Sequence, residues 1–136
     1  MNFSIIIPLY NKENAIKDTI ESVLNQSNPN FEIVVVDDGS TDNSASVVAI
    51  FSDFRIRYIK KPNGGVSSAR NYGVEHSKYE WIMFLDADDL LDCKALEKID
   101  RMMKEVPGYL YYGGNMQLYG GMRCKEVPGF VHISNN

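Results

Sequence analysis

Short, continuous apolar runs that alternate with helix-like segments constrain the fold of this chain more than any other feature of its sequence. Residues 3–9 (FSIIIPL) and 31–36 (FEIVVV) are such runs, which are typical of strands buried on both faces. Between them, side chains suited to burial recur with the helical period at Ala15, Ile16, Thr19, Ile20, Val23 and Leu24. This part of the chain therefore predicts a strand, a helix and a second strand.

The same alternation continues along the rest of the chain. The further elements expected are a helix near 41–51, a strand at 55–61, a helix at 66–76, a strand at 78–86, a helix at 93–106 and a last strand or hairpin from residue 108. This order predicts an α/β fold with a Rossmann-like, mostly parallel sheet and helices on both faces. Asn11 is expected to cap the first helix, and Thr41 or Asp42 the second.

The composition narrows the class of protein. A chain of 136 residues suits one domain, and 44% hydrophobic with 24% charged residues excludes a disordered tail. The formal net charge is 14 − 18 = −4, and without a basic excess we expect no nucleic-acid partner. No apolar run approaches the roughly 18 residues of a membrane span, so we expect a cytoplasmic protein. Cys93 and Cys124 form no metal-binding spacing and are expected to be reduced thiols.

Unusual polar residues follow each predicted strand. In order they are Pro8, Tyr10 and Asn11, then Asp37, Asp38, Gly39 and Ser40, then Asn63, Gly64 and Gly65, and finally Asp86, Asp88 and Asp89. In open α/β sheets, ligands bind at the carboxyl ends of the strands. The sequence therefore predicts one binding site along this edge of the sheet.

The segment FLDADD indicates a site for a divalent metal ion. Asp86 and Asp88 are two residues apart after a strand, so their carboxylates should lie on the same side. Oxygen ligands of this kind suit Mg²⁺ or Mn²⁺. Such an ion binds one or two protein carboxylates and takes its remaining ligands from substrate phosphates and water. Asp89 and Asp92 have a simpler interpretation, as residues that cap the following helix.

Two other segments have both a binding and a structural interpretation. Asp37 or Asp38 could accept hydrogen bonds from a nucleobase or a ribose, or the DDGSTD segment could form only an Asx-type turn before a helix. Gly64 and Gly65 allow a ligand close to the backbone at a helix N-terminus, where phosphate binds well. Arg70 could reach that phosphate, or could pair with Glu75 or Asp86 on the surface.

Four motifs in order resemble a known family. SIIIPLYN, VVVDDGSTD, GGVSSARNYG and WIMFLDADD together look like the nucleotide-sugar-binding half of a family 2 glycosyltransferase with the GT-A fold. The resemblance covers about residues 1–106. It implies transfer of a sugar from a nucleotide-diphosphate donor, with UDP expected, to an acceptor hydroxyl, with Mn²⁺ or Mg²⁺ as cofactor.

The resemblance also implies roles for individual residues. Pro8 and Tyr10 would line the nucleotide pocket, and Asp38 would read the nucleobase with support from Asp37. Asp86 and Asp88 would hold the ribose and the metal, with Asp88 as the more direct ligand. The expected donor-binding set is Pro8, Tyr10, Asn11, Asp37, Asp38, Gly65, Arg70 and Asp86, and the expected metal ligands are Asp88 and Asp86.

The resemblance leaves the catalytic base without a candidate. Members of the family carry it downstream of the DxD segment, in a Glu-Asp motif, whereas after Asp100 the acids here are only Glu105 and Glu126. We therefore expect a single domain, residues 1–136, that stops before the acceptor-binding half. Its core would be residues 1–106, and residues 107–136 would form an edge strand or hairpin and an irregular tail.

The implied partners are a nucleotide-sugar donor and a glycan or lipid-linked acceptor, with peripheral membrane association of the full-length enzyme. Aromatic residues left partly uncovered by truncation would favour self-association; they are Tyr109, Tyr111, Tyr112, Tyr119 and Phe130. One alternative function is a module that binds nucleotides without catalysis. A phosphoacceptor receiver domain fits less well, because its acid pair would follow the first strand rather than the second and fourth.

Overall fold

A computed structural model describes residues 1–108, 116–120 and 123–127 of the chain. The chain divides into two compact units, Met1–Lys94 and Ala95–Asn136, and each unit is described by itself. The first unit holds three helices and the four-stranded sheet, and it contains every residue expected to bind donor or metal.

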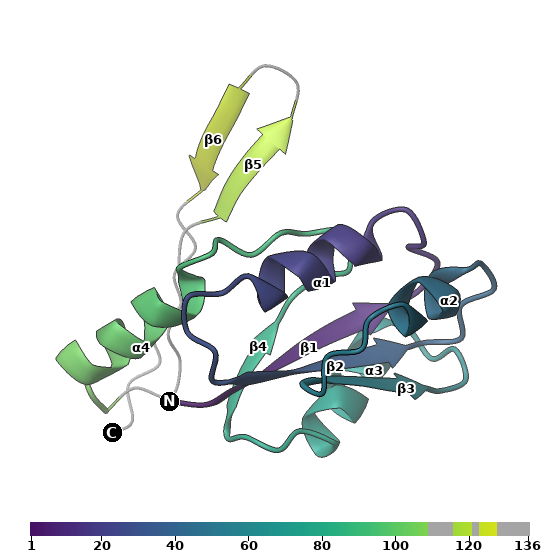
Figure 1. Ribbon diagram of the computed structural model, residues 1–136, viewed down its shortest axis with the longest axis horizontal. Helices are drawn as coiled ribbons and strands as arrows, with labels where there is room; N and C mark the ends of the chain where they lie inside the picture. The colour runs from purple at the N-terminus through teal and green to yellow at the C-terminus, as the bar shows by residue number, and fades with distance from the viewer. Residues whose placement is uncertain (109–115, 121–122, 128–136) are drawn as a thin grey trace. The chain divides into compact units, whose positions relative to one another are not determined.

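The sheet of the first unit is entirely parallel. Its strands are β1 (Phe3–Leu9), β2 (Phe31–Asp37), β3 (Ile56–Lys60) and β4 (Trp81–Phe84), in the spatial order β3-β2-β1-β4 (Figure 1). Phe3 lies level with Phe31 on one side and with Trp81 on the other. The predicted parallel α/β sheet is confirmed, and all four strands end at the same edge.

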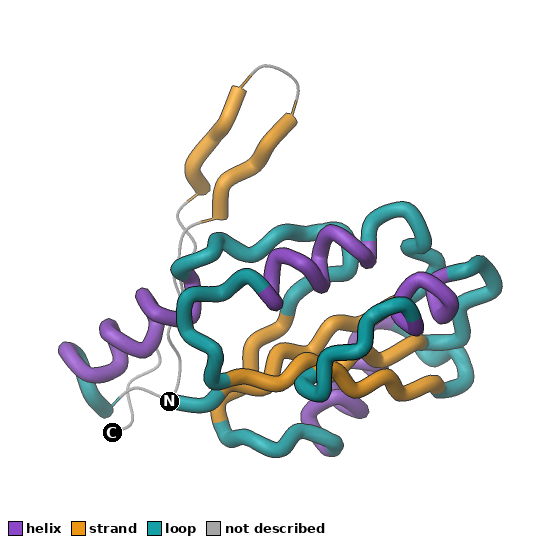
Figure 2. The backbone as a smooth tube through the Cα atoms, in the orientation of Figure 1, coloured by secondary structure: helices purple, strands orange, loops and turns teal. Residues whose placement is uncertain are grey.

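Helices cover both faces of this sheet, as the sequence predicts. α1 (Ile16–Leu24) and α2 (Ser44–Ala49) lie on one face, and α3 (Val66–Glu75) lies on the other (Figures 1 and 2). Because β1 and β2 are central and covered on both faces, their residues are almost all buried. The two continuous apolar runs of the sequence are therefore the centre of the core.

α3 packs closely on the central strands. Ala69 of α3 belongs to one buried cluster with Ile6, Val34 and Val36. A Cβ atom on Gly73 would lie only 2.4 Å from Cγ2 of Ile6, so this helix approaches β1 at a position that a larger residue could not occupy without a shift. This packing fixes the N-terminal end of α3 at the carboxyl edge of the sheet.

The start of α1 differs from the prediction. Asn11 does not cap this helix, which begins at Ile16 after Ala15. Instead, Asn11 adopts a left-handed backbone conformation (φ 50°), and its Oδ1 accepts the N–H groups of Thr41 (2.8 Å) and Asp42 (3.3 Å). Asn11 therefore joins the loop after β1 to the loop after β2, a long-range contact that local spacing does not reveal.

The start of α2 is close to the prediction. The helix begins at Ser44 with Asn43 in the cap position, one or two residues later than expected. Asp42 still supplies a side-chain hydrogen bond, because its Oδ1 accepts the N–H of Ser44 at 2.9 Å. Asp42 therefore still binds a backbone N–H at the start of α2, as predicted, although Asn43 occupies the cap position.

The second unit contains α4 (Ala95–Glu105) and an antiparallel hairpin of β5 (Met116–Gly120) and β6 (Arg123–Val127), in which Met116 lies opposite Val127. The helix expected at 93–106 is present, and the hairpin is one of the two alternatives, a last strand or a hairpin, expected from residue 108. The side chains of Tyr109, Tyr111, Tyr112, Tyr119 and Phe130 lie outside the described part of the structure. The self-association expected from them stays a prediction.

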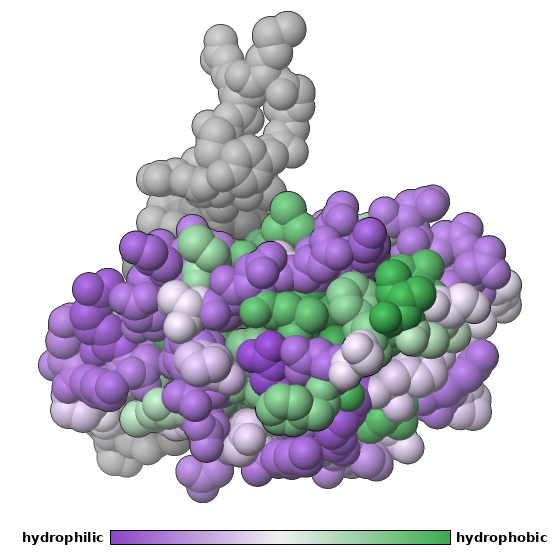
Figure 3. Space-filling view, viewed as in Figure 1, coloured by the Kyte–Doolittle hydropathy of each residue, from purple (hydrophilic) through white to green (hydrophobic). Residues whose placement is uncertain are grey.

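The face of the molecule seen in Figure 3 is mainly hydrophilic, in purple, with some apolar areas in green. Large apolar side chains that remain exposed include Ile50 and Phe54, of which Phe54 is 91% exposed. Among the described residues, no helix has both the length and the apolar character needed to cross a membrane.

Candidate functional site: a pocket at the carboxyl edge of the sheet

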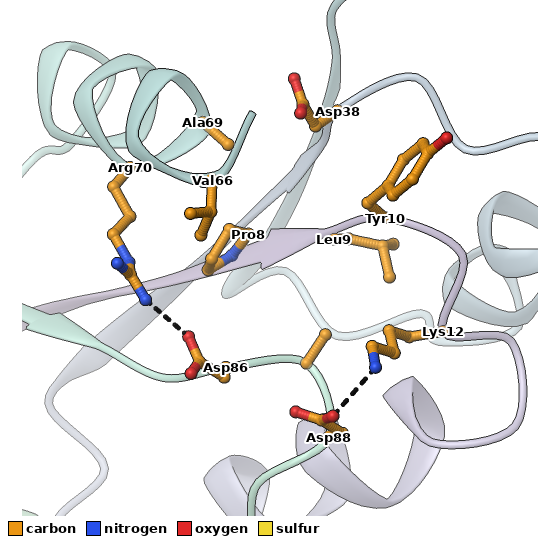
Figure 4. Close-up of a pocket in the computed structure, with 11 residues that line it drawn as sticks. Pro8, Leu9, Tyr10, Lys12, Asp38, Val66, Ala69, Arg70, Asp86 and Asp88 are labelled. Atoms are coloured by element: carbon orange, nitrogen blue, oxygen red, sulfur yellow. Dashed lines mark hydrogen bonds and ion pairs between the residues drawn. The ribbon is translucent and has the colours of Figure 1, made fainter. Parts of the chain in front are cut away.

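A pocket of about 410 Å³ lies where β1, β2 and β4 end and α3 begins (Figure 4). Its lining residues are Pro8, Leu9, Tyr10, Lys12, Asp38, Val66, Ala69, Arg70, Asp86, Ala87 and Asp88. They come from the last residues of β1, from the segments after β1, β2 and β4, and from the first turns of α3. The volume falls within the range of small-molecule and cofactor sites in proteins.

One wall of the pocket is apolar. Tyr10 and Val66 both line it and are 48% and 51% exposed, so large apolar surface faces the solvent at the pocket. The backbone beneath this wall is fixed, because the N–H of Asp38 donates to the carbonyl oxygen of Leu9 at 2.8 Å. An exposed tyrosine ring on a fixed backbone is a suitable surface for stacking a flat aromatic group.

The loop after β4 presents two carboxylates to the pocket. The backbone of this loop is anchored, because Thr19 Oγ1 donates to the carbonyl oxygen of Ala87 at 2.9 Å. Asp86 and Asp88, on either side of Ala87, are exposed. The anchored residue between them lets both carboxylates lie at the pocket, as the two-residue spacing predicts (Figure 4).

Each of these carboxylates is paired with a cationic side chain from another element. Asp86 Oδ1 accepts a hydrogen bond from Nη2 of Arg70 at 2.8 Å, and Asp88 Oδ2 accepts one from Nζ of Lys12 at 3.0 Å. For Arg70, the structure thus shows the predicted surface pair with Asp86. Its guanidinium also lies 5.9 Å from the centre of the Phe84 ring, and its buried Nε has no hydrogen-bond partner among the residues that the structure describes.

The loop after β4 carries a third acid, Asp89. Burial raises the pKa of Asp89 above its ordinary value, and the charges of Asp86 and Asp88 raise it further. In the described part of the chain, no group of three or more His, Cys, Asp or Glu residues is placed to hold a metal ion. Asp86 and Asp88 offer two exposed carboxylates, and a set of this kind fits Mg²⁺ or Mn²⁺ with its other ligands taken from phosphates and water.

Asp38 lies in a different environment, although it also lines the pocket. It is 3% exposed, and its carboxylate accepts hydrogen bonds from Lys61 Nζ (2.6 Å) and from the N–H groups of Gly64 (2.9 Å) and Gly65 (2.8 Å). Burial acts to raise the pKa of Asp38, but these donors outweigh it and hold that pKa below the ordinary value. Asp38 is a charged anchor for the loop before α3.

Asp37 points away from the pocket lining. Its Oδ1 accepts the N–H of Ser40 at 2.8 Å, and its Oδ2 accepts the hydroxyl of Tyr58 on β3. Burial raises the pKa of the Tyr58 hydroxyl, and this hydrogen bond raises it further. The Ser40 contact is the Asx-type turn that the sequence allowed, so between the two neighbouring acids it is Asp38 that faces the pocket.

The two glycine amides just before α3 are engaged within the protein. Gly65 has a positive φ of 92°, which favours glycine, and it precedes the first residue of the helix. The amide N–H groups of Gly64 and Gly65 both donate to Asp38. In this structure these glycines shape the loop and do not line the pocket.

The pocket therefore brings together six of the residues expected from the sequence: Pro8, Tyr10, Asp38, Arg70, Asp86 and Asp88. Three others, Asn11, Asp37 and Gly65, support the surrounding loops. Sequence reasoning missed Lys12, whose side chain meets that of Asp88 although the two residues are 76 positions apart. The one available signal was its place directly after a predicted strand end.

The sequence and the fold of this chain are similar to those of known glycosyltransferases. The model of the family described as Glycosyl transferase family 2 matches residues 4–122. The chain belongs to glycosyltransferase family 2. The glycosyltransferase GlyA of Streptococcus pneumoniae is 38% identical over 132 residues, which cover 96% of this chain and 18% of that protein. The chain spans less than a fifth of the length of the first curated relatives that it matches.

Two solved structures show the same fold as this family 2 chain. Residues 1–349 of S. aureus TarS, in complex with UDP-GlcNAc, give a TM-score of 0.73 at 32% identity, over 77% of this chain and 32% of that one. The mannosyltransferase PcManGT of Pyrobaculum calidifontis, in complex with GDP-Man and Mn²⁺, gives 0.71 at 25% identity, over 79% and 33%. The α/β sheet predicted from the sequence is thus a GT-A fold.

Proposed function

We propose that this chain is the donor-binding part of a metal-dependent glycosyltransferase that uses a UDP-sugar. One observation carries the proposal. The exposed carboxylates of Asp86 and Asp88 lie in the same pocket as the exposed ring of Tyr10, at the carboxyl edge of a parallel sheet. A nucleoside diphosphate with a divalent cation needs an aromatic surface for its base and oxygen ligands for its metal, and this pocket contains both.

Different residues of the pocket contact different parts of the donor. Tyr10 and Pro8 contact the base. Asp38 lines the pocket beside the base while its carboxylate anchors the loop before α3, and Asp37, Asn11 and Gly65 hold the surrounding loops. Asp86 contacts the ribose and shares the metal with Asp88, which is the more direct ligand. Bound Mn²⁺ or Mg²⁺ would supply Lewis-acid chemistry that neutralises the departing diphosphate. TarS with UDP-GlcNAc supports a UDP donor, and PcManGT with Mn²⁺ supports a metal.

The remaining steps belong to the longer protein of which chains like this form a part in the curated relatives. A carboxylate outside residues 1–136 would act as general base on the acceptor hydroxyl, which would then attack the anomeric carbon. The acceptor would be a glycan or a lipid-linked saccharide, handled at the cytoplasmic side by a peripherally bound enzyme. Nucleotide binding without catalysis is the activity expected of the isolated chain.

Calorimetric titration with UDP and with GDP, each with and without Mn²⁺, tests this proposal. We expect UDP to bind in the presence of Mn²⁺ and to lose at least tenfold in affinity in Asp88→Asn. Glu80→Gln is the matched control, because Glu80 is an exposed acid just before β4, at the opposite end of the strand from the pocket. Absence of UDP binding by the wild-type chain, or equal losses in both variants, would contradict the proposal.

A further inference from the structure

We propose that Lys12 serves two partners in succession. In the free pocket it neutralises Asp88, and when a divalent cation takes Asp88, the ammonium group moves to the diphosphate of the donor. The inference rests on the proposed function and names a positioning and binding residue within the same site. It concerns this chain's own side chain, whose place in the pocket the structure gives directly.

The backbone of Lys12 is fixed, so its side chain moves from a constant point. Its N–H donates to Oγ of Ser44 at 3.0 Å. Its carbonyl oxygen accepts the N–H groups of Ala15 (3.0 Å) and Ile16 (2.9 Å) at the start of α1. From this anchor, Nζ reaches across the pocket to the loop after β4 (Figure 4). Only the flexible four-carbon stem has to move to change partner.

The bond between Lys12 and Asp88 is easily exchanged. The side chains of the pair are 44% and 49% exposed, and exposed ion pairs contribute little to stability. The pair of Lys61 and Asp38 in the same pocket region has exposures of 11% and 4% and is therefore held in place. Of these two lysines, Lys12 is the one whose ammonium can leave its carboxylate at low cost.

Charge determines where the ammonium goes. A divalent cation on Asp86 and Asp88 repels the ammonium of Lys12, which then lacks its carboxylate partner. The diphosphate oxygens that complete the metal's coordination bring negative charge to the same place, and a lysine ammonium offers three donors to phosphate. On the other side of the pocket, the buried Nε of Arg70 has no partner in the described part of the chain, so the site holds spare donor capacity toward an anion.

This exchange predicts opposite signs for two affinities. Without nucleotide, Lys12 competes with the metal for Asp88, so Lys12→Met should strengthen binding of Mn²⁺ alone by about threefold. With Mn²⁺ present, Lys12 contacts the diphosphate, so the same variant should weaken UDP binding by about tenfold, as loss of a charge-assisted hydrogen bond does. A residue that merely supported the fold would weaken both.

Electron paramagnetic resonance of free Mn²⁺ measures the first affinity, and calorimetric titration of UDP in saturating Mn²⁺ measures the second. Lys17→Met is the matched control, because Lys17 forms an exposed pair with Glu21 on α1, with side-chain exposures of 54% and 47%, and does not line the pocket. We expect it to change neither affinity. Lys12→Arg, which keeps the charge, should restore both toward the wild-type values.

Each outcome decides the inference. A strengthened Mn²⁺ affinity together with a weakened UDP affinity in Lys12→Met supports it. Weakening of both, no change in either, or a change in only one overturns it, while Mn²⁺-dependent UDP binding by the wild-type chain leaves the proposed function intact. If the wild-type chain binds neither Mn²⁺ nor UDP, the proposed function fails, and the exchange fails with it.

Discussion

Neighbouring acids lie at the ends of both β2 and β4, but the first pair is buried and the second pair is exposed. Asp37 is the last residue of β2 and Asp38 follows it; they are 0% and 3% exposed, and both accept hydrogen bonds from side chains and backbone groups around them. After β4, Asp86 and Asp88 are exposed, and each accepts a hydrogen bond from one cationic side chain. Burial commits the first pair to holding loops, whereas exposure leaves the second pair available to a ligand.

The largest expected effect comes from breaking the ion pair between Asp38 and Lys61. Asp38→Ala leaves the ammonium of Lys61 buried without its carboxylate, and removes the acceptor for the N–H groups of Gly64 and Gly65. We expect the free energy of unfolding to fall by about 3 kcal/mol or more. Urea unfolding followed by circular dichroism measures it, and a loss below about 1 kcal/mol would show that the anchor role is wrong.

Acid should lower the stability of the fold through the buried acid Glu32. Burial acts to raise the pKa of Glu32, but the hydroxyl of Ser4, the N–H of Lys78 and the guanidinium of Arg57 hold that pKa below 4.5. Such a group stabilises the fold above its unfolded pKa, and this contribution is lost as the pH falls through the lower folded-state pKa.

We therefore expect the unfolding free energy to decline below about pH 4.5. The decline should be shallower in Glu32→Gln than in wild type, because the amide does not titrate. Urea unfolding at intervals from neutral to acid pH measures both curves. Parallel curves for the two proteins would rule out a stabilising role of ionised Glu32.

Two tyrosines extend the comparison to aromatic residues. Tyr58→Phe removes the hydroxyl that donates to buried Asp37, so we expect a loss of about 1–2 kcal/mol in stability. Tyr10→Ala removes an exposed ring at the pocket, so stability should change little while UDP binding weakens by about tenfold or more, as loss of base stacking does. Equal effects of the two substitutions on UDP binding would contradict the separation of roles.

The smallest expected effect is on the exposed pair. Asp88→Asn removes one partner of an exposed ion pair, and the unfolding free energy should stay within about 0.5 kcal/mol of wild type. The same urea titration as for Asp38→Ala measures it. A loss above about 2 kcal/mol would mean that Asp88 has a structural role like that of Asp38.

Much of the fold could be predicted because it depends on local patterns. The apolar runs at β1 and β2, and the polar residues after each strand, place the site at the correct edge of the sheet. The contacts that could not be predicted join residues far apart in the chain. Asn11 binds the backbone at Thr41, and Lys12 meets Asp88, and no periodicity links either pair.

The choice between neighbouring residues also depended on three dimensions. From the residues alone, either Asp37 or Asp38 could contact a ligand, and only the turn at Ser40 and the hydroxyl of Tyr58 decide that Asp37 turns away. The amide groups of Gly64 and Gly65 lie at a helix start suited to phosphate, yet a buried carboxylate takes them first.

The most direct measurement is the position of bound Mn²⁺ in the chain, from paramagnetic broadening of backbone amide signals in the presence of UDP. We expect the strongest broadening at residues 86–89, with a second region at residues 10–12, of which Tyr10 and Lys12 line the same pocket. The amide signals of Asp37 and Glu32 should be broadened less. Broadening centred on the loop after β2, or spread evenly over the acidic residues of the surface, would contradict the claim that the exposed pair after β4 holds the metal.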